Sequence, residues 1–328
     1  MNEKVNDKIS DLKGIDLLDL LQYIESYDLE YRDTLNLEDE VTIGIEIEYE
    51  RMIKFLIDRF IKNNFEDWRS ITDESLQLGG EINSPIIHDE PYRWEELKKI
   101  CKYLKKRRVI TGCNAGGHIH IGSQVLGTNH NNWRKFAKTY AVYEDILFRF
   151  FYGDKILGRK SLYCYAPPIA DRILDKIEDL NSAKDLQELR VHLPVASRYQ
   201  AINFTNVRFD LMDEGVRYKN TIELRCPNST VEEVIWQNNI NAIAKILTAV
   251  TKPNFDEEYL DYKIANGEAA SVYEYHTYNE VLLKKVLEFT DLIFDNNKDK
   301  IYFLRQYIKD FQETETNYLA FNAKKFTK

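Results

Sequence analysis

Glutamates alternate with apolar residues in the segment 41–50, VTIGIEIEYE. Because successive side chains of a β-strand point to opposite faces, Glu46, Glu48 and Glu50 would share one face, and isoleucines would occupy the other. Carboxylates two residues apart on a strand lie about 7 Å apart and repel each other by about 2 kcal/mol at an effective dielectric constant of 20. The strand therefore either turns this face to water, where the repulsion is small, or lines a cleft in which a divalent cation neutralises it.

Imidazole, carboxylate and guanidinium groups follow the same alternation in two later segments. His118 and His120 alternate with isoleucines in GHIHIG, residues 117–122, and Glu223 and Arg225 alternate with apolar residues in TIELR, residues 221–225. Carboxylates together with imidazoles suit Mg²⁺ or Mn²⁺. An arginine near a carboxylate suits a phosphate oxygen beside such a metal, because its guanidinium group binds phosphate through two parallel hydrogen bonds.

Two further polar residues lie next to these strands in the sequence. Glu81 follows the pair Gly79-Gly80, and Asn203 precedes the segment that holds Glu223. If the strands belong to one sheet, they form a polar concave face. This set of groups predicts a site for a nucleoside triphosphate with two or more metal ions, where the metals and arginine stabilise charge on a transferring phosphoryl group.

The elements that would position these residues are strands mixed with helices. Hydrophobic periodicity and turn residues predict strands at 41–50, 68–71, 76–83, 116–122, 201–207 and 220–226. They predict helices at 15–23, 51–63, 91–106, 132–151 and 231–250, one or two helices within 171–191, and a charged helical remainder after residue 253. We therefore predict an α+β fold in which helices pack on one face of a largely antiparallel sheet.

The composition is typical of a soluble protein. The chain has 328 residues, with 45 Lys and Arg against 54 Asp and Glu and a net charge of −9, which disfavours nucleic-acid binding through a basic surface. No apolar run long enough to span a membrane is present, and the polar N-terminal residues lack the apolar core of a signal peptide. Four scattered cysteines fit a reducing compartment, so we expect a cytoplasmic protein without membrane contact.

The order of these motifs resembles that of a known family. GIEIEY at 44–49, DESL at 73–76, GEINSP at 80–85, GHIHIG at 117–122, Arg198 with Asn203, and TIELR at 221–225 occur in this order. The pattern resembles the amidoligase family, carboxylate–amine ligases of the glutamine synthetase and glutamate–cysteine ligase superfamily. The resemblance implies a curved, glutamine synthetase-like sheet, with a catalytic domain at 39–252 between helical extensions at 1–38 and 253–328.

The resemblance also implies a reaction and its residues. ATP, held with Mg²⁺ or Mn²⁺ on the polar face, would phosphorylate a substrate carboxylate, and an amine would then attack the acyl phosphate to form an amide. The substrates would be a carboxylate and an amine on small molecules, peptides or proteins. The expected catalytic residues are Glu48, Arg225 and Arg198, the cofactor-binding residues His118, His120, Asn203 and Arg225, and the metal ligands Glu46, Glu48, Glu81, His118 and Glu223. The turn Asp73-Glu74-Ser75 departs from the family's common Asp-Gly-Ser, and we leave it out of the expected site.

Other classes of function use some of the same features. A phosphotransferase of the guanidino-kinase type would share the sheet, the metals and the arginines but would need no amine site. A non-catalytic nucleotide- or peptide-binding protein would keep the fold alone, and Tyr163 and Tyr165 could then belong to an aromatic recognition surface. The sequences GxxxxGK[ST], GxGxxG and GxSxG are absent, which disfavours a phosphate-binding loop and a serine hydrolase.

Overall fold

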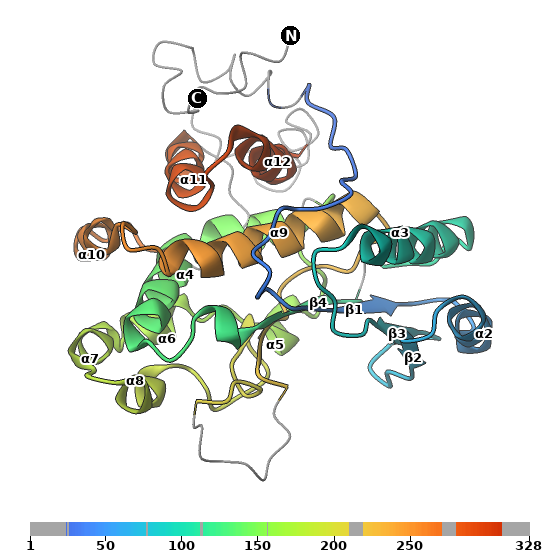
Figure 1. Cartoon of the computed structure of the whole chain (residues 1–328), viewed down its shortest axis with the longest axis horizontal. Helices are drawn as coiled ribbons and strands as arrows, with labels where there is room; N and C mark the ends of the chain where they lie inside the picture. Colours follow the sequence, from blue (N-terminus) through green and yellow to red (C-terminus); the bar gives the residue numbers. More distant parts are fainter. Residues whose placement is uncertain are drawn as a thin grey trace.

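An open sheet of antiparallel strands organises the chain (Figure 1). The computed structural model describes Ile24 and residues 26–76, 78–111, 114–155, 157–209, 219–270 and 280–309. Within these residues the sheet has six strands in the order β2-β3-β1-β4-β6-β5, and every neighbouring pair is antiparallel. The strands are β1 (Ile43–Tyr49), β2 (Arg69–Ile71), β3 (Gly80–Asn83), β4 (Gly117–Gly122), β5 (Ile202–Asn203) and β6 (Thr221–Leu224).

The longer helices gather on one side of this sheet. In Figure 1, α3, α4 and α9 lie over one face of the sheet, and α11 and α12 form a further layer beyond α4 and α9. The helices are α2 (Lys54–Asn64), α3 (Pro91–Lys106), α4 (His130–Phe151), α5 (Leu162–Tyr165), α6 (Ala170–Leu174), α7 (Ile177–Ser182), α8 (Leu186–His192), α9 (Glu233–Val250), α10 (Glu257–Ala265), α11 (Glu280–Ile293) and α12 (Asn297–Ile308), with a 3-10 turn η3 (Ser123–Val125).

The main core lies between the sheet and these helices. Alternation turns Ile43, Ile45 and Ile47 of β1, together with Ile119 and Ile121 of β4, to one face, where each is at most 1% exposed. Helices α4 and α9 are buried along most of their length, because the sheet side packs against one flank and α11 and α12 pack against the other. The opposite face of the sheet is therefore free to carry the polar side chains.

The predicted α+β arrangement with an antiparallel sheet is confirmed, and several predicted bounds are corrected. The strand predicted at 201–207 is limited to Ile202–Asn203, because the Asn203 side chain accepts the Thr205 backbone N–H at 2.8 Å and turns the chain. The strand predicted at 76–83 begins only at Gly80, after Leu78 with a φ of 49°. The segment 171–191 forms three short helices, α6, α7 and α8, rather than one or two.

Two other predictions, the helix at 15–23 and the domain division, stay untested. The helix predicted at 15–23 lies outside the described residues. The division into domains at residues 38 and 252 stays a prediction. Across the described ranges, none of the helices has both the length and the apolar character needed to cross a membrane.

Candidate active site

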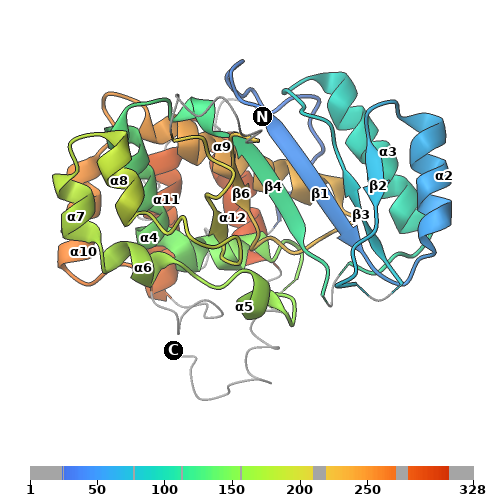
Figure 2. The ribbon, with the colours of Figure 1, turned by 90° about the horizontal axis from the view of Figure 1, so that it is seen from below.

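The strand register places the predicted site residues on one face of the sheet. Glu46 lies opposite His118, and Glu48 lies opposite Glu81. His120 lies opposite Glu223, which in turn lies opposite Asn203. Residues opposite each other in an antiparallel pair share a face, as do residues two apart on one strand. Five strands thus direct polar side chains to the face of the sheet that points away from α4 and α9. Figure 2 shows the molecule from the side of this face.

A polar cavity of about 790 Å³ lies on this face. Of the predicted site residues, only His120 is absent from its lining, and His120 reaches the cavity indirectly through its contact with Glu46. The lining consists of Glu46, Glu48, Asp73, Ser75, Glu81, Asn114, His118, Arg159, Ser161, Tyr165, Arg198, Tyr199, Asn203, Thr205, Asn206, Lys219, Glu223 and Arg225.

Glu46 is held by both histidines. His118 Nδ1 lies 3.0 Å from Glu46 Oε2, and His120 Nε2 lies 2.9 Å from Glu46 Oε1. Burial by itself would raise the pKa of Glu46, but the hydrogen bonds and charges of the two histidines outweigh burial and lower it well below its usual range. The carboxylate is therefore ionised and fixed in orientation at neutral pH.

Glu81 and Glu223 differ in the protonation state that their surroundings favour. Burial raises the pKa of Glu81 to about 7, and the negative charge of Glu46 acts in the same direction. Burial also acts to raise the pKa of Glu223, but the charges of His120, His118 and Arg225 overcome it and lower the pKa below its ordinary value. Arg225 Nη1 lies 2.6 Å from Glu223 Oε1, and Asn203 Nδ2 donates to Glu223 Oε2 at 2.7 Å.

The acidic residues and histidines form three overlapping groups that could each hold a metal ion. Within each group, one ligand atom from every residue lies within 4.8 Å of the others. Carboxylate oxygens with one imidazole fit a hard divalent cation, and such a cation would neutralise carboxylates that otherwise repel one another in a buried place. The residues present thus fit the predicted metal. The groups are Glu46–Glu81–His118, Glu46–His120–Glu223 and Glu48–Asp73–Glu81.

Sequence reasoning missed two residues of this site. Asp73 belongs to the turn that departs from the family pattern and is not among the predicted site residues, yet it joins Glu48 and Glu81 in the third group. Its Oδ1 also accepts the Ser75 backbone N–H at 2.8 Å, so the turn is closed without a glycine. Arg159 enters the cavity from the loop between α4 and α5, and no strand periodicity could have indicated it.

Arg198 lies at a more exposed part of the cavity than the other predicted residues. Its Nη2 donates to the Tyr199 hydroxyl at 2.7 Å, and its guanidinium group lies 4.9 Å from the centre of the Tyr199 ring. The Tyr165 ring lies 6.1 Å from the Tyr199 ring. Tyr163, the other tyrosine of the predicted aromatic surface, instead stacks on Phe148. The catalytic role that the resemblance implies for Arg198 stays a prediction.

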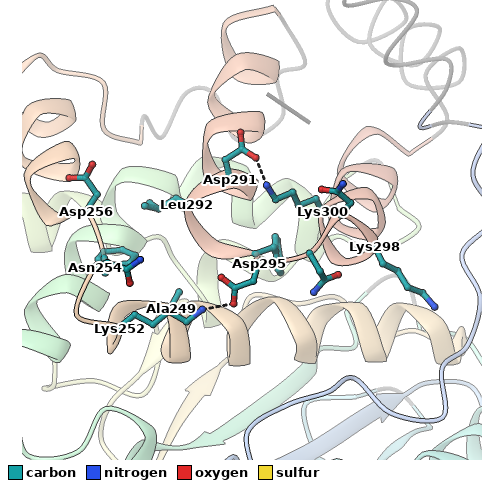
Figure 3. Close-up of a pocket in the computed structure, with 13 residues that line it drawn as sticks. Ala249, Lys252, Asn254, Asp256, Asp291, Leu292, Asp295, Lys298 and Lys300 are labelled. Atoms are coloured by element: carbon teal, nitrogen blue, oxygen red, sulfur yellow. Dashed lines mark hydrogen bonds and ion pairs between the residues drawn. The ribbon is translucent and has the colours of Figure 1, made fainter. Parts of the chain in front are cut away.

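A second cavity, of about 670 Å³, lies between the ends of α9, α11 and α12 (Figure 3). Two of its lysines pair with two of its aspartates: Lys252 with Asp295, and Lys300 with Asp291. Cations and anions are therefore matched within the cavity itself. The acidic cavity on the sheet, which contains five carboxylate side chains and all but one of the predicted site residues, is the candidate active site.

The open antiparallel sheet thus presents carboxylates, imidazoles and a guanidinium group on one face. Residues 22–247 match the family model described as "Putative amidoligase enzyme". The chain therefore belongs to the amidoligase family, a family of ligase-type enzymes that form amide bonds. The matched region contains every residue of the predicted site. None of the curated proteins matches the chain.

Proposed function

We propose that this protein is an ATP-dependent carboxylate–amine ligase with a glutamine synthetase-like catalytic fold. ATP would bind with Mg²⁺ on the polar face of the sheet, and the reaction would pass through an acyl phosphate. Membership of the amidoligase family supports the formation of an amide bond. The observation that carries the rest is the overlap of the ligand groups: the Glu46–Glu81–His118 group shares Glu46 with one of the other two groups and Glu81 with the other.

The overlap matters because it allows neighbouring metal ions to be bridged by one ligand. Mg²⁺ usually binds through one or two carboxylates together with substrate phosphates. Two neighbouring groups that share a carboxylate would therefore suit a triphosphate that spans both of them. When bound, Mg²⁺ would neutralise the phosphate oxygens and stabilise the charge that develops on the transferring phosphoryl group.

Arg225 is the residue best placed to bind the γ-phosphate. One of its nitrogens, Nη1, contacts Glu223, while its Nε is buried and has no acceptor among the described residues. A buried donor without an acceptor is costly, and a phosphate oxygen would satisfy it with a charge-assisted hydrogen bond. Asn203 holds Glu223 from the other side, so Arg225 is presented in a fixed direction.

The two chemical steps of this reaction need only ATP, the acid and the amine as reactants. A carboxylate oxygen of the acid attacks the γ-phosphorus of ATP, the bond between the β- and γ-phosphates breaks, and ADP leaves. The neutral amine attacks the acyl carbon, and the carbon–oxygen bond to phosphate breaks. The proton lost by the amine ends on the departing phosphate. The protein would bind and orient the two substrates and ATP, and it would stabilise the charge on the transferring phosphoryl group.

A thermal-unfolding experiment tests the nucleotide and metal part of the proposal. Wild type, Glu48→Gln and Glu50→Gln are heated with ATP, with Mg²⁺ and with both. Glu50 is the matched control, because it belongs to the same strand region but lies outside the cavity lining and contacts Asn114. A ligand at 100 times its dissociation constant adds about 2.7 kcal/mol of stability. We expect the unfolding temperature of the wild type to rise only when ATP and Mg²⁺ are both present. This rise should be lost in Glu48→Gln and kept in Glu50→Gln. An unchanged unfolding temperature of the wild type with both ligands would contradict ATP binding.

Hydroxylamine tests the chemistry. An acyl phosphate reacts with hydroxylamine to give a hydroxamate, so a carboxylate that stimulates ADP release should also yield its hydroxamate. ADP release with a stable phosphorylated product and no hydroxamate would favour the phosphotransferase instead.

A further inference from the structure

Arg159 is a buried cation that the proposed reaction has not used. It lies in the loop between α4 and α5, is 5% exposed, and lines the acidic cavity. Its own backbone N–H donates to Asn228 Oδ1 at 3.0 Å. Within the described part of the chain, no carboxylate lies within ion-pair distance of its guanidinium group. Because burying a charge without an ionic partner is costly, its presence calls for a role beyond packing.

The guanidinium group binds three consecutive backbone carbonyls. Nη2 donates to the Arg225 carbonyl oxygen at 2.7 Å, and Nη1 donates to the Pro227 carbonyl oxygen at 2.8 Å, with the Cys226 carbonyl oxygen 3.5 Å away. These carbonyls follow directly after β6, where the Arg225 side chain leaves the sheet. The planar donors of arginine can hold several acceptors in one fixed geometry, whereas a lysine ammonium group cannot reproduce that arrangement.

Arg159 also meets the metal-ligand side of the cavity across Gly116. A Cβ atom built on Gly116 would lie 2.8 Å from His118 Nε2, and 3.3 Å from both Arg159 Cζ and Glu48 Oε2. The Gly116 backbone N–H donates to Glu48 Oε2. Since glycine has no side chain, His118, Arg159 and Glu48 can approach the same point beside position 116, and a larger residue there would collide first with His118.

We propose that Arg159 is a positioning residue of this site: it fixes the backbone at 225–227 and so sets the direction of Arg225 toward the nucleotide phosphates. This inference rests on the proposed function. Apart from Asp73, which lies in a turn, the candidate metal ligands lie on strands held by the sheet, so the loss of Arg159 should affect nucleotide binding much more than binding of the metal alone.

The substitution Arg159→Lys tests the inference, with Arg149→Lys as its matched control. Arg149 is also a buried arginine that donates to backbone carbonyls, those of Tyr307 and Ile308, but it is absent from the lining of the acidic cavity. Dissociation constants are measured for Mn²⁺ alone and for the non-hydrolysable analogue AMPPNP with Mg²⁺. We expect Arg159→Lys to weaken analogue binding about tenfold and to leave Mn²⁺ binding within about twofold, while Arg149→Lys changes neither.

The outcomes separate the inference from the proposed function. Wild-type analogue affinity in folded Arg159→Lys would overturn the inference alone, as would equal weakening of Mn²⁺ and analogue binding. A wild-type protein that binds Mn²⁺ but not the analogue would overturn the proposed function.

Hydrogen exchange of the wild-type protein gives an answer even if Arg159→Lys does not fold. Peptides covering residues 157–162 and 225–229 should gain protection together when Mg²⁺ and AMPPNP bind, while peptides covering 303–309, beside Arg149, should not. If ligand binding protects residues 225–229 from exchange but not residues 157–162, the segment that holds Arg159 is not coupled to the segment that holds Arg225, and the inference is overturned.

Discussion

Glu46 and His118 lie opposite each other on β1 and β4, and their side chains meet at 3.0 Å on the uncovered face of the sheet. Burial acts to lower the pKa of His118, but the hydrogen bond to Glu46 and the charge of Glu48 outweigh it and raise the pKa above its ordinary value. A raised pKa favours the protonated imidazole, and a protonated ring nitrogen cannot bind a metal ion. This relationship makes metal binding and protonation competing events at the same site.

Metal affinity should rise with pH. Glu81, with a pKa of about 7, and His118, with a raised pKa, bind metal only when deprotonated. Mn²⁺ binding followed by calorimetry should strengthen by about tenfold or more between pH 6 and pH 8, since each unit below a pKa costs about a factor of ten. Repeating the titration in buffers with different ionisation enthalpies should reveal proton release. An affinity that does not change over this range would contradict the assignment of these two ligands.

Glu81→Gln should stabilise the metal-free protein at high pH. The pKa of Glu81 is about 7 in the folded protein, above its ordinary value of 4.5, so the folded state binds the extra proton. The contribution of this proton to the free energy of unfolding is therefore fully present below about pH 4.5, and it is lost as the pH rises through about 7. Removing the charge should increase the free energy of unfolding by about 1–3 kcal/mol at pH 8 and by little at pH 4. Urea unfolding with a chelator present measures this; an unfavourable change at pH 8 would contradict it.

Asp73→Asn should raise the Mg²⁺ requirement. Asp73 contributes to the group with Glu48 and Glu81, and an amide is a weaker ligand for a hard cation than a carboxylate. The Mg²⁺ concentration for half-maximal stabilisation by ATP should rise about tenfold. Glu74→Gln is the control, because Glu74 is exposed in the same turn and belongs to none of the three groups. Equal effects of the two substitutions would remove Asp73 from the site.

Arg225→Ala should reduce turnover far more than Arg198→Ala. Arg225 is half-buried beside Glu223, whereas Arg198 is exposed and contacts Tyr199. Loss of a donor that stabilises transition-state charge costs about 10²- to 10³-fold in kcat, while an exposed arginine should cost less than about tenfold. Once a substrate pair is found, kcat and KM for ATP decide between them. A loss of kcat in Arg198→Ala as large as in Arg225→Ala would contradict this ranking and would support the catalytic role that the family resemblance implies for both arginines.

Part of this site follows from the sequence alone. Alternation along a strand is fixed by backbone stereochemistry, so the spacing in GIEIEY, GHIHIG and TIELR determined which side chains share a face before any strand was paired. The same alternation determined the apolar face that α4 and α9 cover. Charge and residue type then indicated metal and phosphate chemistry.

Only the tertiary structure decided which of these residues meet. Strand order brings β3, β1, β4 and β6 together, so Glu81 is buried beside Glu46 and its pKa rises to about 7, mainly through burial. His120 contacts Glu46 but does not line the cavity. Asp73 and Arg159 arrive from a turn and a loop, whose side chains have no local periodicity to indicate where they point. Their positions depend on long-range packing and hydrogen bonds, such as those from Arg159 to residues 225–227, and these exist only once the chain has folded.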